Sequence, residues 1–236
     1  MRYAIQRSRE RGYASHGWLE SRFSFSFAEY LNPDRMGFGV LRVINDDTIM
    51  PGGTFDMHPH RDMEIITIVT QGAIEHHDSM GNRSVLRAGE VQHMSAGTGI
   101  RHSEANAEAE ILKLFQIWIY PKSRGIVPNY QQKPFDAAYT RNCLGVLVSG
   151  DGEDASLPIH QDARILRGVF DTDQTITYRN AHPGHGIYLF VIDGEVSLLE
   201  ETLQKRDAME IEGLGEVTLN IKAGTDLLVF ELPMMQ

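Results

Sequence analysis

The sequence predicts an all-β protein. Groups of turn-forming residues, such as NPD at 32–34, NDD at 45–47 and GTG at 97–99, recur about every 8 to 15 residues. The segments between these turns are short and rich in Val, Ile, Phe and Thr, which are favoured in strands. Many short strands with regularly spaced turns are typical of a β-sandwich or a β-barrel.

The first half of the chain contains the clearest candidate strands. In FSFSF, residues 23–27, aromatic and serine side chains alternate as they would in a half-buried strand. Four apolar segments follow, FGVLRVI, EIITIVT, AIEHHDS and ILKLFQIWIY, at 38–44, 64–70, 73–79 and 111–120. Residues 121–140 carry three prolines and little periodicity, so we expect a connection there.

The second half of the chain repeats this rhythm. GIYLFVIDGEVSLLEE at 186–201 echoes MEIITIVTQGAIEHHD at 63–78, because each has an apolar strand, a glycine turn and a second strand. We interpret the echo as an internal duplication that gives two related β domains in tandem, residues 1–132 and 133–236. A single continuous sandwich is the alternative.

Composition and charge exclude several classes of protein. The formal net charge of −10 argues against binding to nucleic acid or to an anionic membrane, since both need a basic surface. The single cysteine, Cys143, cannot form an intramolecular disulfide and lies in a strand-like segment, where we expect it to be buried. No apolar run is long enough for a signal peptide or approaches the ~18 residues of a membrane span. We therefore expect a soluble, cytoplasmic protein.

Two pairs of metal-ligand residue types stand out in the first half. His58 and His60 are two residues apart, and so are His102 and Glu104, which follow a glycine-rich turn. Because residues two apart on a strand face the same side, each pair would point together. If the two strands lie side by side in a barrel, three imidazoles and one carboxylate converge, which suits a first-row transition metal with room for a further ligand. The alternative is that these are surface histidines or buried, hydrogen-bonded ones.

The surrounding motifs resemble those of a known family. Gly52, His58, His60 and Gly72 have the spacing of the first cupin motif, and GTGIRH at 97–102 contains the core of the second. Together with HGWLESRFSFSFAEYLNPDRMGFGVLRVINDD, HPHRDMEI, HDSMGN and MSAGTGIRHSE, they make the chain similar to pirins, the two-domain cupin family that includes bacterial quercetin 2,3-dioxygenases. The resemblance implies two jelly-roll β-barrels face to face, with one metal in the N-terminal barrel.

The resemblance also implies which residues would act. The metal ligands would be His58, His60, His102 and Glu104, with Gly97 standing where many cupins have proline. The metal would be one divalent ion, with iron expected and nickel, manganese, copper, cobalt or zinc also compatible. The family implies oxygen-dependent cleavage of flavonol-like aromatic enols with release of carbon monoxide. In that reaction Glu104 would accept the hydroxyl proton.

Two other functions remain open on the sequence. As an alternative, the chain would be a non-catalytic, iron-binding module whose oxidation state alters contact with a protein partner, as proposed for eukaryotic pirins. A third interpretation is an isomerase or hydrolase, since cupin barrels host many reactions. Sugar-phosphate substrates would need basic residues in the pocket, yet Arg61 and Arg101 are expected to face away from it.

The C-terminal copy lacks the ligand pattern. Counting back from Gly194 places Asn180 and His182 where His58 and His60 stand, and an approximate alignment places Asn220 and Lys222 where His102 and Glu104 stand. A protonated lysine cannot be a metal ligand, so we expect this domain to be metal-free. His182 and His185 are interpreted as loop residues.

Several other polar residues have two interpretations each. Glu64 would either orient a metal-binding imidazole or pair with Arg61 or another base. For His76 and His77 solvated hairpin positions are favoured, although one of them would be able to line the pocket, and His93 is expected near the site. Gln116 would meet a substrate oxygen or satisfy a neighbouring residue.

Overall fold

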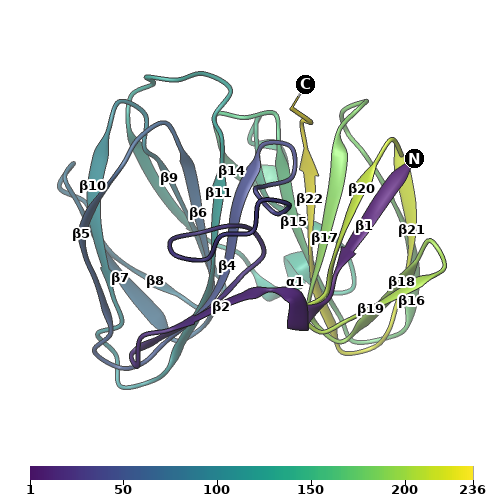
Figure 1. Cartoon of the computed structure of the whole chain (residues 1–236), viewed down its shortest axis with the longest axis horizontal. Coiled ribbons are helices and arrows are strands. Elements are labelled where there is room, and N and C mark those ends of the chain that lie inside the picture. The colour runs from purple at the N-terminus through teal and green to yellow at the C-terminus, as the bar shows by residue number, and fades with distance from the viewer. Residues whose placement is uncertain (236) are drawn as a thin grey trace.

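The computed structural model describes residues 1–235 and has two β-barrel domains side by side (Figure 1). The N-terminal barrel combines a seven-stranded sheet, in the order β12-β9-β6-β11-β4-β3-β2, with a four-stranded sheet, in the order β5-β10-β7-β8. Its strands are β2 (Gly12–Ser15), β3 (Leu19–Phe23), β4 (Leu41–Ile49), β5 (Thr54–His60), β6 (Glu64–Gln71), β7 (Ala73–Asp78), β8 (Arg83–Arg87), β9 (Glu90–Ser95), β10 (Ile100–Ala105), β11 (Leu112–Ile119) and β12 (Asn129–Pro134).

The C-terminal barrel has the same plan. Its seven-stranded sheet has the order β1-β20-β17-β22-β15-β13-β14, and its four-stranded sheet has the order β16-β21-β18-β19. Its strands are β1 (Arg2–Gln6), β13 (Gly145–Ser149), β14 (Leu157–Pro158), β15 (Arg164–Phe170), β16 (Gln174–Arg179), β17 (Gly186–Asp193), β18 (Glu195–Leu198), β19 (Glu201–Gln204), β20 (Ala208–Glu212), β21 (Glu216–Ile221) and β22 (Thr225–Leu232). The helical elements are η1 (Ser8–Glu10), α1 (Ala137–Thr140) and η2 (Glu153–Ala155). Within residues 1–235 no helix has the length and apolar character needed to cross a bilayer.

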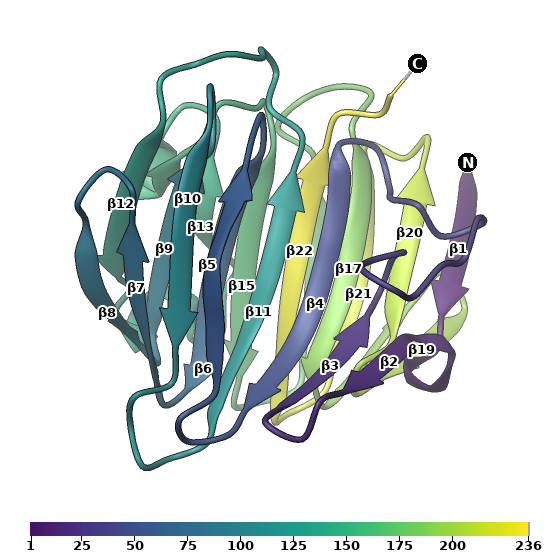
Figure 2. The same ribbon diagram turned by 60° about the vertical axis from the view of Figure 1, so that its left-hand side comes forward.

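The two seven-stranded sheets pack against each other. One apolar cluster joins side chains from both of them, including Ile66 and Phe115 of the N-terminal barrel and Phe190 and Phe230 of the C-terminal barrel. Their strands therefore have one face in this interface and the other inside a barrel. Figure 2 shows β4 and β11 of one sheet in front of β17 and β22 of the other. Burial on both faces explains why successive side chains of EIITIV and IYLFVI are buried, where a half-exposed strand would bury alternate ones.

The strand pairing departs from the expected domain boundaries at two places. Residues Arg2–Gln6 form β1, which pairs with β20 in the C-terminal sheet, as Figure 1 shows at its right-hand side. The expected boundary at 132/133 falls inside β12, which pairs with β9 and completes the N-terminal sheet. The division into residues 1–132 and 133–236 thus stays a proposal. Strand β1 comes from the start of the chain but belongs to the C-terminal barrel.

Three local expectations were wrong. In FSFSF, β3 ends at Phe23, and the serines of the following irregular segment are as buried as its phenylalanines. NDD at 45–47 is no turn but lies in the middle of β4. Cys143 is exposed, because it precedes β13 instead of lying within it.

Candidate metal centre

Two neighbouring strands of the four-stranded sheet bring the predicted histidines together. Strands β5 and β10 are antiparallel, and His102 lies directly opposite His58. One nitrogen from each of His58, His60 and His102 lies within 4.8 Å of the other two. The ring centroids are 4.4 Å apart for His58 and His102 and 4.8 Å apart for each pair that includes His60. The prediction that these three side chains converge is confirmed.

Gly97 shapes the loop that leads into β10. Its φ of +44° is strained for residues with a side chain, and an added Cβ would lie 2.1 Å from the carbonyl oxygen of Ile126. The Gly97 carbonyl also accepts a hydrogen bond from the Asp62 amide, just after β5. Proline has a negative φ and would not fit here, which accounts for glycine at this position.

Hydrogen bonds fix how two of the imidazoles present their nitrogens. His58 Nδ1 is 2.7 Å from the carbonyl oxygen of Asp56, to which it can only donate, so Nε2 keeps its lone pair. His102 Nδ1 is 3.5 Å from His76 Nδ1, and His102 Nε2 is buried with no hydrogen-bond partner. Burial, together with the neighbouring imidazoles, lowers the pKa of His60 to about 4 and that of His102 to about 2. Both rings are therefore neutral at physiological pH, as metal coordination requires.

His76 lies behind His102 and holds it in place. It is fully buried, stacks on Tyr130 and lies 3.0 Å through Nε2 from Asp78 Oδ2. Because the Asp78 carboxylate accepts this bond, His76 Nδ1 is left as an acceptor, and His102 Nδ1 carries the proton between them. The favoured solvated position was thus wrong for His76, whereas His77 is exposed.

Glu104 is close to His102 but less close to the other two histidines. Its Oε1 is 4.0 Å from His102 Nδ1, and Glu104 groups with His102 and His76 within 4.8 Å. A register shift between His102 and Glu104 in the pairing with β5 accounts for this offset. Burial, helped by the Asp47 charge, raises the pKa of Glu104 to about 7, although the hydrogen bond from Gln116 opposes the shift.

Gln116 satisfies its neighbours, the second of its two expected roles. Its Nε2 donates to Glu104 Oε2 at 3.3 Å, and its Oε1 accepts from the Thr67 hydroxyl at 3.1 Å. The amide thereby links β10 to the facing seven-stranded sheet and fixes one oxygen of Glu104. Glu104 Oε1 remains buried without a hydrogen-bond partner.

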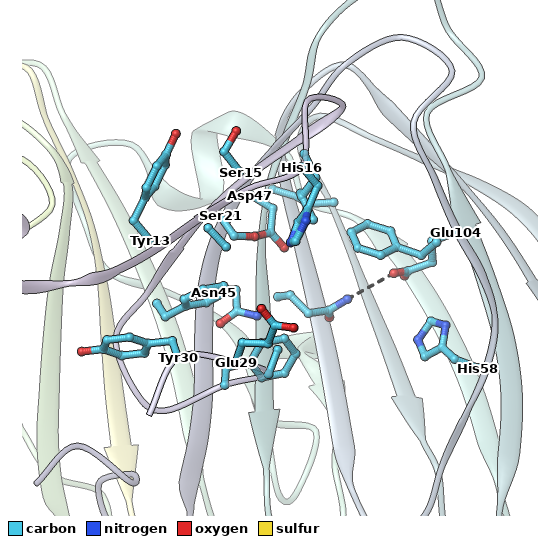
Figure 3. A pocket seen from close by; sticks show the side chains of 18 of the residues that line it. Tyr13, Ser15, His16, Ser21, Glu29, Tyr30, Asn45, Asp47, His58 and Glu104 are labelled. Atoms are coloured by element: carbon cyan, nitrogen blue, oxygen red, sulfur yellow. Dashed lines mark hydrogen bonds between the residues drawn. The ribbon is translucent and has the colours of Figure 1, made fainter. Parts of the chain in front are cut away.

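The cluster opens into a cavity of about 880 Å³ between the two sheets of the N-terminal barrel. One side carries His58, His60, His102 and Glu104, and Figure 3 shows Ser21, Asn45 and Asp47 across the cavity from His58 and Glu104. Apolar and aromatic side chains also line the cavity, among them Leu19, Phe23, Phe27, Phe55, Leu114 and Trp118. A largely apolar space with a few convergent polar groups is typical of a small-molecule site.

Glu64 and His93 face the other side of their sheet. Glu64 is fully buried and accepts hydrogen bonds from His93 Nε2 at 2.7 Å, Ser95 Oγ at 2.7 Å and the His160 amide at 3.0 Å. Because His160 belongs to the second half of the chain, this cluster lies between the barrels. The turn at Asp62, with φ of +49°, breaks the alternation that begins at His58. The expectation that Glu64 orients a metal-binding imidazole was therefore wrong, and it pairs with a base other than Arg61.

The interior of the C-terminal barrel is packed with apolar side chains. Ile176 and Tyr178 of β16 lie opposite Leu219 and Val217 of β21, and all four belong to one apolar cluster. Asn220 lies opposite Thr175, and Lys222 is exposed and pairs with Asp173 at 2.8 Å. Counting back from Gly194 therefore points to the wrong residues of β16, because the loop between β16 and β17 is longer than the loop between β5 and β6.

His182 and His185 lie in that longer loop, as expected, and both approach Glu231. Their Nδ1 atoms are 3.1 and 3.3 Å from Glu231 Oε1, so the three residues form a second group of ligand types. Glu231 already accepts from the Ala181 and His182 amides and the Tyr178 hydroxyl, and the Arg164 guanidinium lies 3.4 Å away. These contacts satisfy the carboxylate and anchor the loop, while the nearby positive charge disfavours a cation.

Sequence reasoning missed the polar wall opposite the histidines. Asn45 and Asp47 alternate on β4 and face the cavity, while Ser21 faces it from the adjacent β3. Apolar residues on both sides of NDDT, in LRVINDDTI, would have indicated a strand that continues through these polar positions. Polar residues clustered in this way are more often found in turns, which concealed it.

Two family models match the chain. The model described as Pirin matches residues 4–119, and the one described as quercetinase C-terminal cupin domain matches residues 146–232. A quercetin 2,3-dioxygenase of Escherichia coli strain K12 is 42% identical over 230 residues, which are 97% of this chain and 98% of that protein. A pirin-like protein of Caulobacter vibrioides is 43% identical over 221 residues, covering 93% and 95% of the two chains.

Solved structures agree with these matches. The bacterial pirin YhhW of Escherichia coli in complex with nickel(II) has a TM-score of 0.93 at 40% identity, covering 99% of this chain and 100% of that one. A quercetin 2,3-dioxygenase of Acinetobacter baumannii has a TM-score of 0.79 at 19% identity, covering 99% of this chain and 80% of that one. The second likeness is one of fold alone, whereas the first extends to the sequence.

Proposed function

We propose a function for this chain, which belongs to the pirin family of two-domain cupin proteins. It is a metal-dependent dioxygenase that acts on flavonol-like aromatic enols. The metal ligands in this proposal are His58, His60, His102 and Glu104. The observation that carries it is the convergence of three imidazoles on one cavity, with His102 Nε2 and Glu104 Oε1 buried and without a hydrogen-bond partner among the described residues. Buried polar atoms rarely lack a partner, so a bound cation is the simplest way to satisfy both.

The donor set fits a divalent transition metal. Imidazole nitrogens and a carboxylate oxygen suit iron, nickel, manganese, copper, cobalt and zinc, so the expectation of iron stays a prediction. A bound metal supplies a Lewis acid that favours the deprotonated enol and a contact that activates dioxygen. The chain itself orients the donors, through the Asp56 carbonyl at His58 and through His76 at His102.

Glu104 is the proton acceptor in this proposal. It is buried, lines the cavity beside His102 and could accept a hydroxyl proton from a molecule bound there. The Gln116 amide holds Oε2, so Oε1 is the oxygen available to the cation and the carboxylate would act as ligand and base together. His60 packs edge-on against Trp118 at 4.9 Å, which places an apolar surface beside the reacting group and limits the access of water.

The cavity lining favours a neutral aromatic substrate. Among the described residues, its lining contains neither lysine nor arginine, whereas sugar phosphates would require such cations. Arg61 and Arg101 are both exposed and absent from that lining. These features disfavour the isomerase or hydrolase interpretation with anionic substrates.

The test combines metal analysis with oxygen-dependent turnover of quercetin. The purified protein should contain about one divalent metal per chain and consume oxygen as the visible absorbance of quercetin falls, with no loss under anaerobic conditions. His58→Ala should lose metal and activity by more than the roughly 10- to 100-fold that removal of an outer hydrogen-bond partner costs. His77→Ala removes an exposed imidazole outside the cavity and should leave both unchanged. A metal-loaded protein without oxygen-dependent turnover would contradict the proposal.

The redox-responsive, protein-binding alternative stays a prediction, as does a cytoplasmic location. A pull-down under reducing and oxidising conditions separates this alternative from the enzyme. Partner capture that changes with the oxidation state of the metal would support it, and redox-independent capture or none would exclude it.

A further inference from the structure

The strongest unexplained feature outside the ligand cluster is a buried carboxyl group. Asp47 is 5% exposed, and only its Oδ1 accepts a hydrogen bond among the described residues, from the Ser21 hydroxyl. Its neighbour Asp46 points to the opposite face of β4 and pairs with Arg11 and Arg206, whereas Asp47 forms no ion pair within residues 1–235. An uncompensated buried carboxyl destabilises a fold, and such groups are concentrated at functional sites.

Asn45 adds a second unused polar group on the same face. It is 3% exposed, and its Oδ1 is buried with no hydrogen-bond partner among residues 1–235. The side chain directly across from it on β11 is Gln116, which is already engaged with Thr67 and Glu104. The Asn45 carboxamide is therefore free to bind a molecule in the cavity.

The cavity thus has polar groups on two facing walls. The histidine cluster lies on the four-stranded sheet, and Asn45 and Asp47 lie across the cavity on β4 of the seven-stranded sheet (Figure 3). Aromatic residues such as Phe27 and Trp118 also line the cavity. A planar aromatic molecule with oxygen atoms at both ends matches this distribution. Because the lining offers neither lysine nor arginine, neutral oxygens match the wall with Asn45 and Asp47 better than a carboxylate, sulfate or phosphate does.

We propose that Asn45 and Asp47 bind a vicinal pair of phenolic hydroxyl groups on the ring of the substrate that lies away from the enol. A phenolic hydroxyl donates to the Asp47 carboxylate or the Asn45 carbonyl and accepts from the Asn45 amide, so both side chains are satisfied. Ser21 holds the other oxygen of Asp47 and fixes its orientation. The inference rests on the proposed function for the placement of the enol at the histidines, and it adds a specificity determinant at the opposite wall.

The test is anaerobic equilibrium binding, which requires no turnover. The metal-containing protein is titrated with quercetin, kaempferol and galangin, which carry two, one and no hydroxyl groups on the pendant ring. Quenching of tryptophan fluorescence reports occupancy, because Trp18 and Trp118 both line the cavity. For the wild-type protein we expect quercetin to bind roughly tenfold more tightly than galangin, with kaempferol between them.

Variants connect this preference to the two side chains. Asn45→Ala and Asp47→Ala should reduce quercetin affinity to about that of galangin while leaving galangin affinity unchanged. Asp47→Asn should retain part of the preference, since an amide still forms hydrogen bonds that are weaker than those of a carboxylate. The control is Glu20→Gln, whose side chain lies on the exposed face of β3 and should preserve the full series.

The outcomes separate this inference from the proposed function. An equal loss of affinity for all three flavonols would assign Asn45 and Asp47 a structural role, and no loss would remove them from the contact. Either result overturns the inference, as does the failure of all three to bind the wild-type protein. Hydroxyl-dependent binding without oxygen-dependent turnover would leave the inference standing and reject the dioxygenase. Oxygen-dependent turnover without a preference for hydroxylated pendant rings would reject the inference and leave the dioxygenase standing.

Discussion

At the scale of single residues, two adjacent carboxyl groups on β4 have opposite environments. Asp46 lies 3.3 Å from Arg11 and 2.9 Å from Arg206, whereas burial raises the pKa of Asp47 from 3.8 to about 7. A raised carboxyl pKa means that the folded state binds the proton more tightly than the unfolded state. Asp47 therefore costs stability progressively as the pH rises from about 4 to about 7.

We expect Asp47→Asn to stabilise the protein by about 1–3 kcal/mol at pH 8 and by less at pH 5, where the wild-type group is protonated in the folded state. Asp46→Asn should instead destabilise it at both values, because it removes the charge facing two arginines. Urea unfolding of the two variants and the wild type at pH 5 and pH 8 measures this. A loss of stability in Asp47→Asn at pH 8 would contradict the assignment of Asp47 as an uncompensated group.

Strand alternation explains which site residues the sequence predicted and which it did not. His58, His60 and His102 were predicted because two-residue spacing continues to hold along a regular strand. Of the two interpretations of Glu64, the orientation of a metal-binding imidazole failed because the alternation does not continue past the turn at Asp62, whereas pairing with another base was correct. Asn45 and Asp47 were missed because a buried polar pair is rare, and sequence alone does not tell it from a turn.

At the scale of secondary-structure elements, the pairing of β7 with β10 brings His76 and Asp78 next to His102. Glu104 lies opposite His76, and His102 lies opposite Asp78. Burial opposes ionisation of Asp78, but hydrogen bonds from the Asn82 side chain, His76 and two backbone amides lower its pKa. Asp78 thus stays ionised and holds the proton of His76 at Nε2, which leaves the lone pair of His102 Nε2 available.

His76→Phe should therefore weaken metal binding by about 10- to 100-fold. Phenylalanine retains the stacking on Tyr130, where the ring centroids are 4.7 Å apart, but it removes the acceptor that fixes the His102 tautomer. Competition with a chelator measures the affinity of the folded protein, and His77→Ala is the matched control on the same strand. An unchanged affinity in His76→Phe would show that His102 needs no partner at Nδ1.

Elements were predicted best where turn residues bound a short strand-like segment. The segments at 64–70, 73–79 and 111–120 correspond to β6, β7 and β11. Strand β12 was missed because its sequence, NYQQKP, is polar and ends in proline, and only pairing with β9 makes it a strand. Edge strands of this kind are determined by their neighbours more than by their own composition.

At the scale of the whole molecule, the duplication was visible because both copies bury the same two faces. Gly72 and Gly194 adopt similar positive φ angles, +75° and +83°, at the turns that follow β6 and β17, which hold equivalent places in their sheets. The pairing of β1 with the C-terminal sheet could not be predicted from the sequence pattern, because Arg2–Gln6 carries too few apolar residues to indicate a partner. Contacts between distant segments depend on the assembled surfaces, which local patterns do not encode.

Glu64 connects the two barrels and provides a test of that assembly. Burial alone would raise its pKa, but hydrogen bonds from His93, Ser95 and the His160 amide lower it overall. A lowered carboxyl pKa contributes stability above the ordinary value of 4.5 and loses it as the pH falls. Removal of the carboxylate would leave these buried donors unsatisfied at the interface between the domains.

Glu64→Ala should consequently lower the free energy of unfolding by about 3–5 kcal/mol at pH 7, with a smaller difference from the wild type below pH 4.5. Glu64→Gln should lose less, because one amide oxygen still accepts a hydrogen bond. Urea unfolding monitored across pH measures the difference, and hydrogen exchange at the His160 amide localises it. Since Glu64 lies outside the cavity lining, metal content should be retained in both variants. Loss of metal with intact stability would instead place Glu64 in support of the histidine cluster.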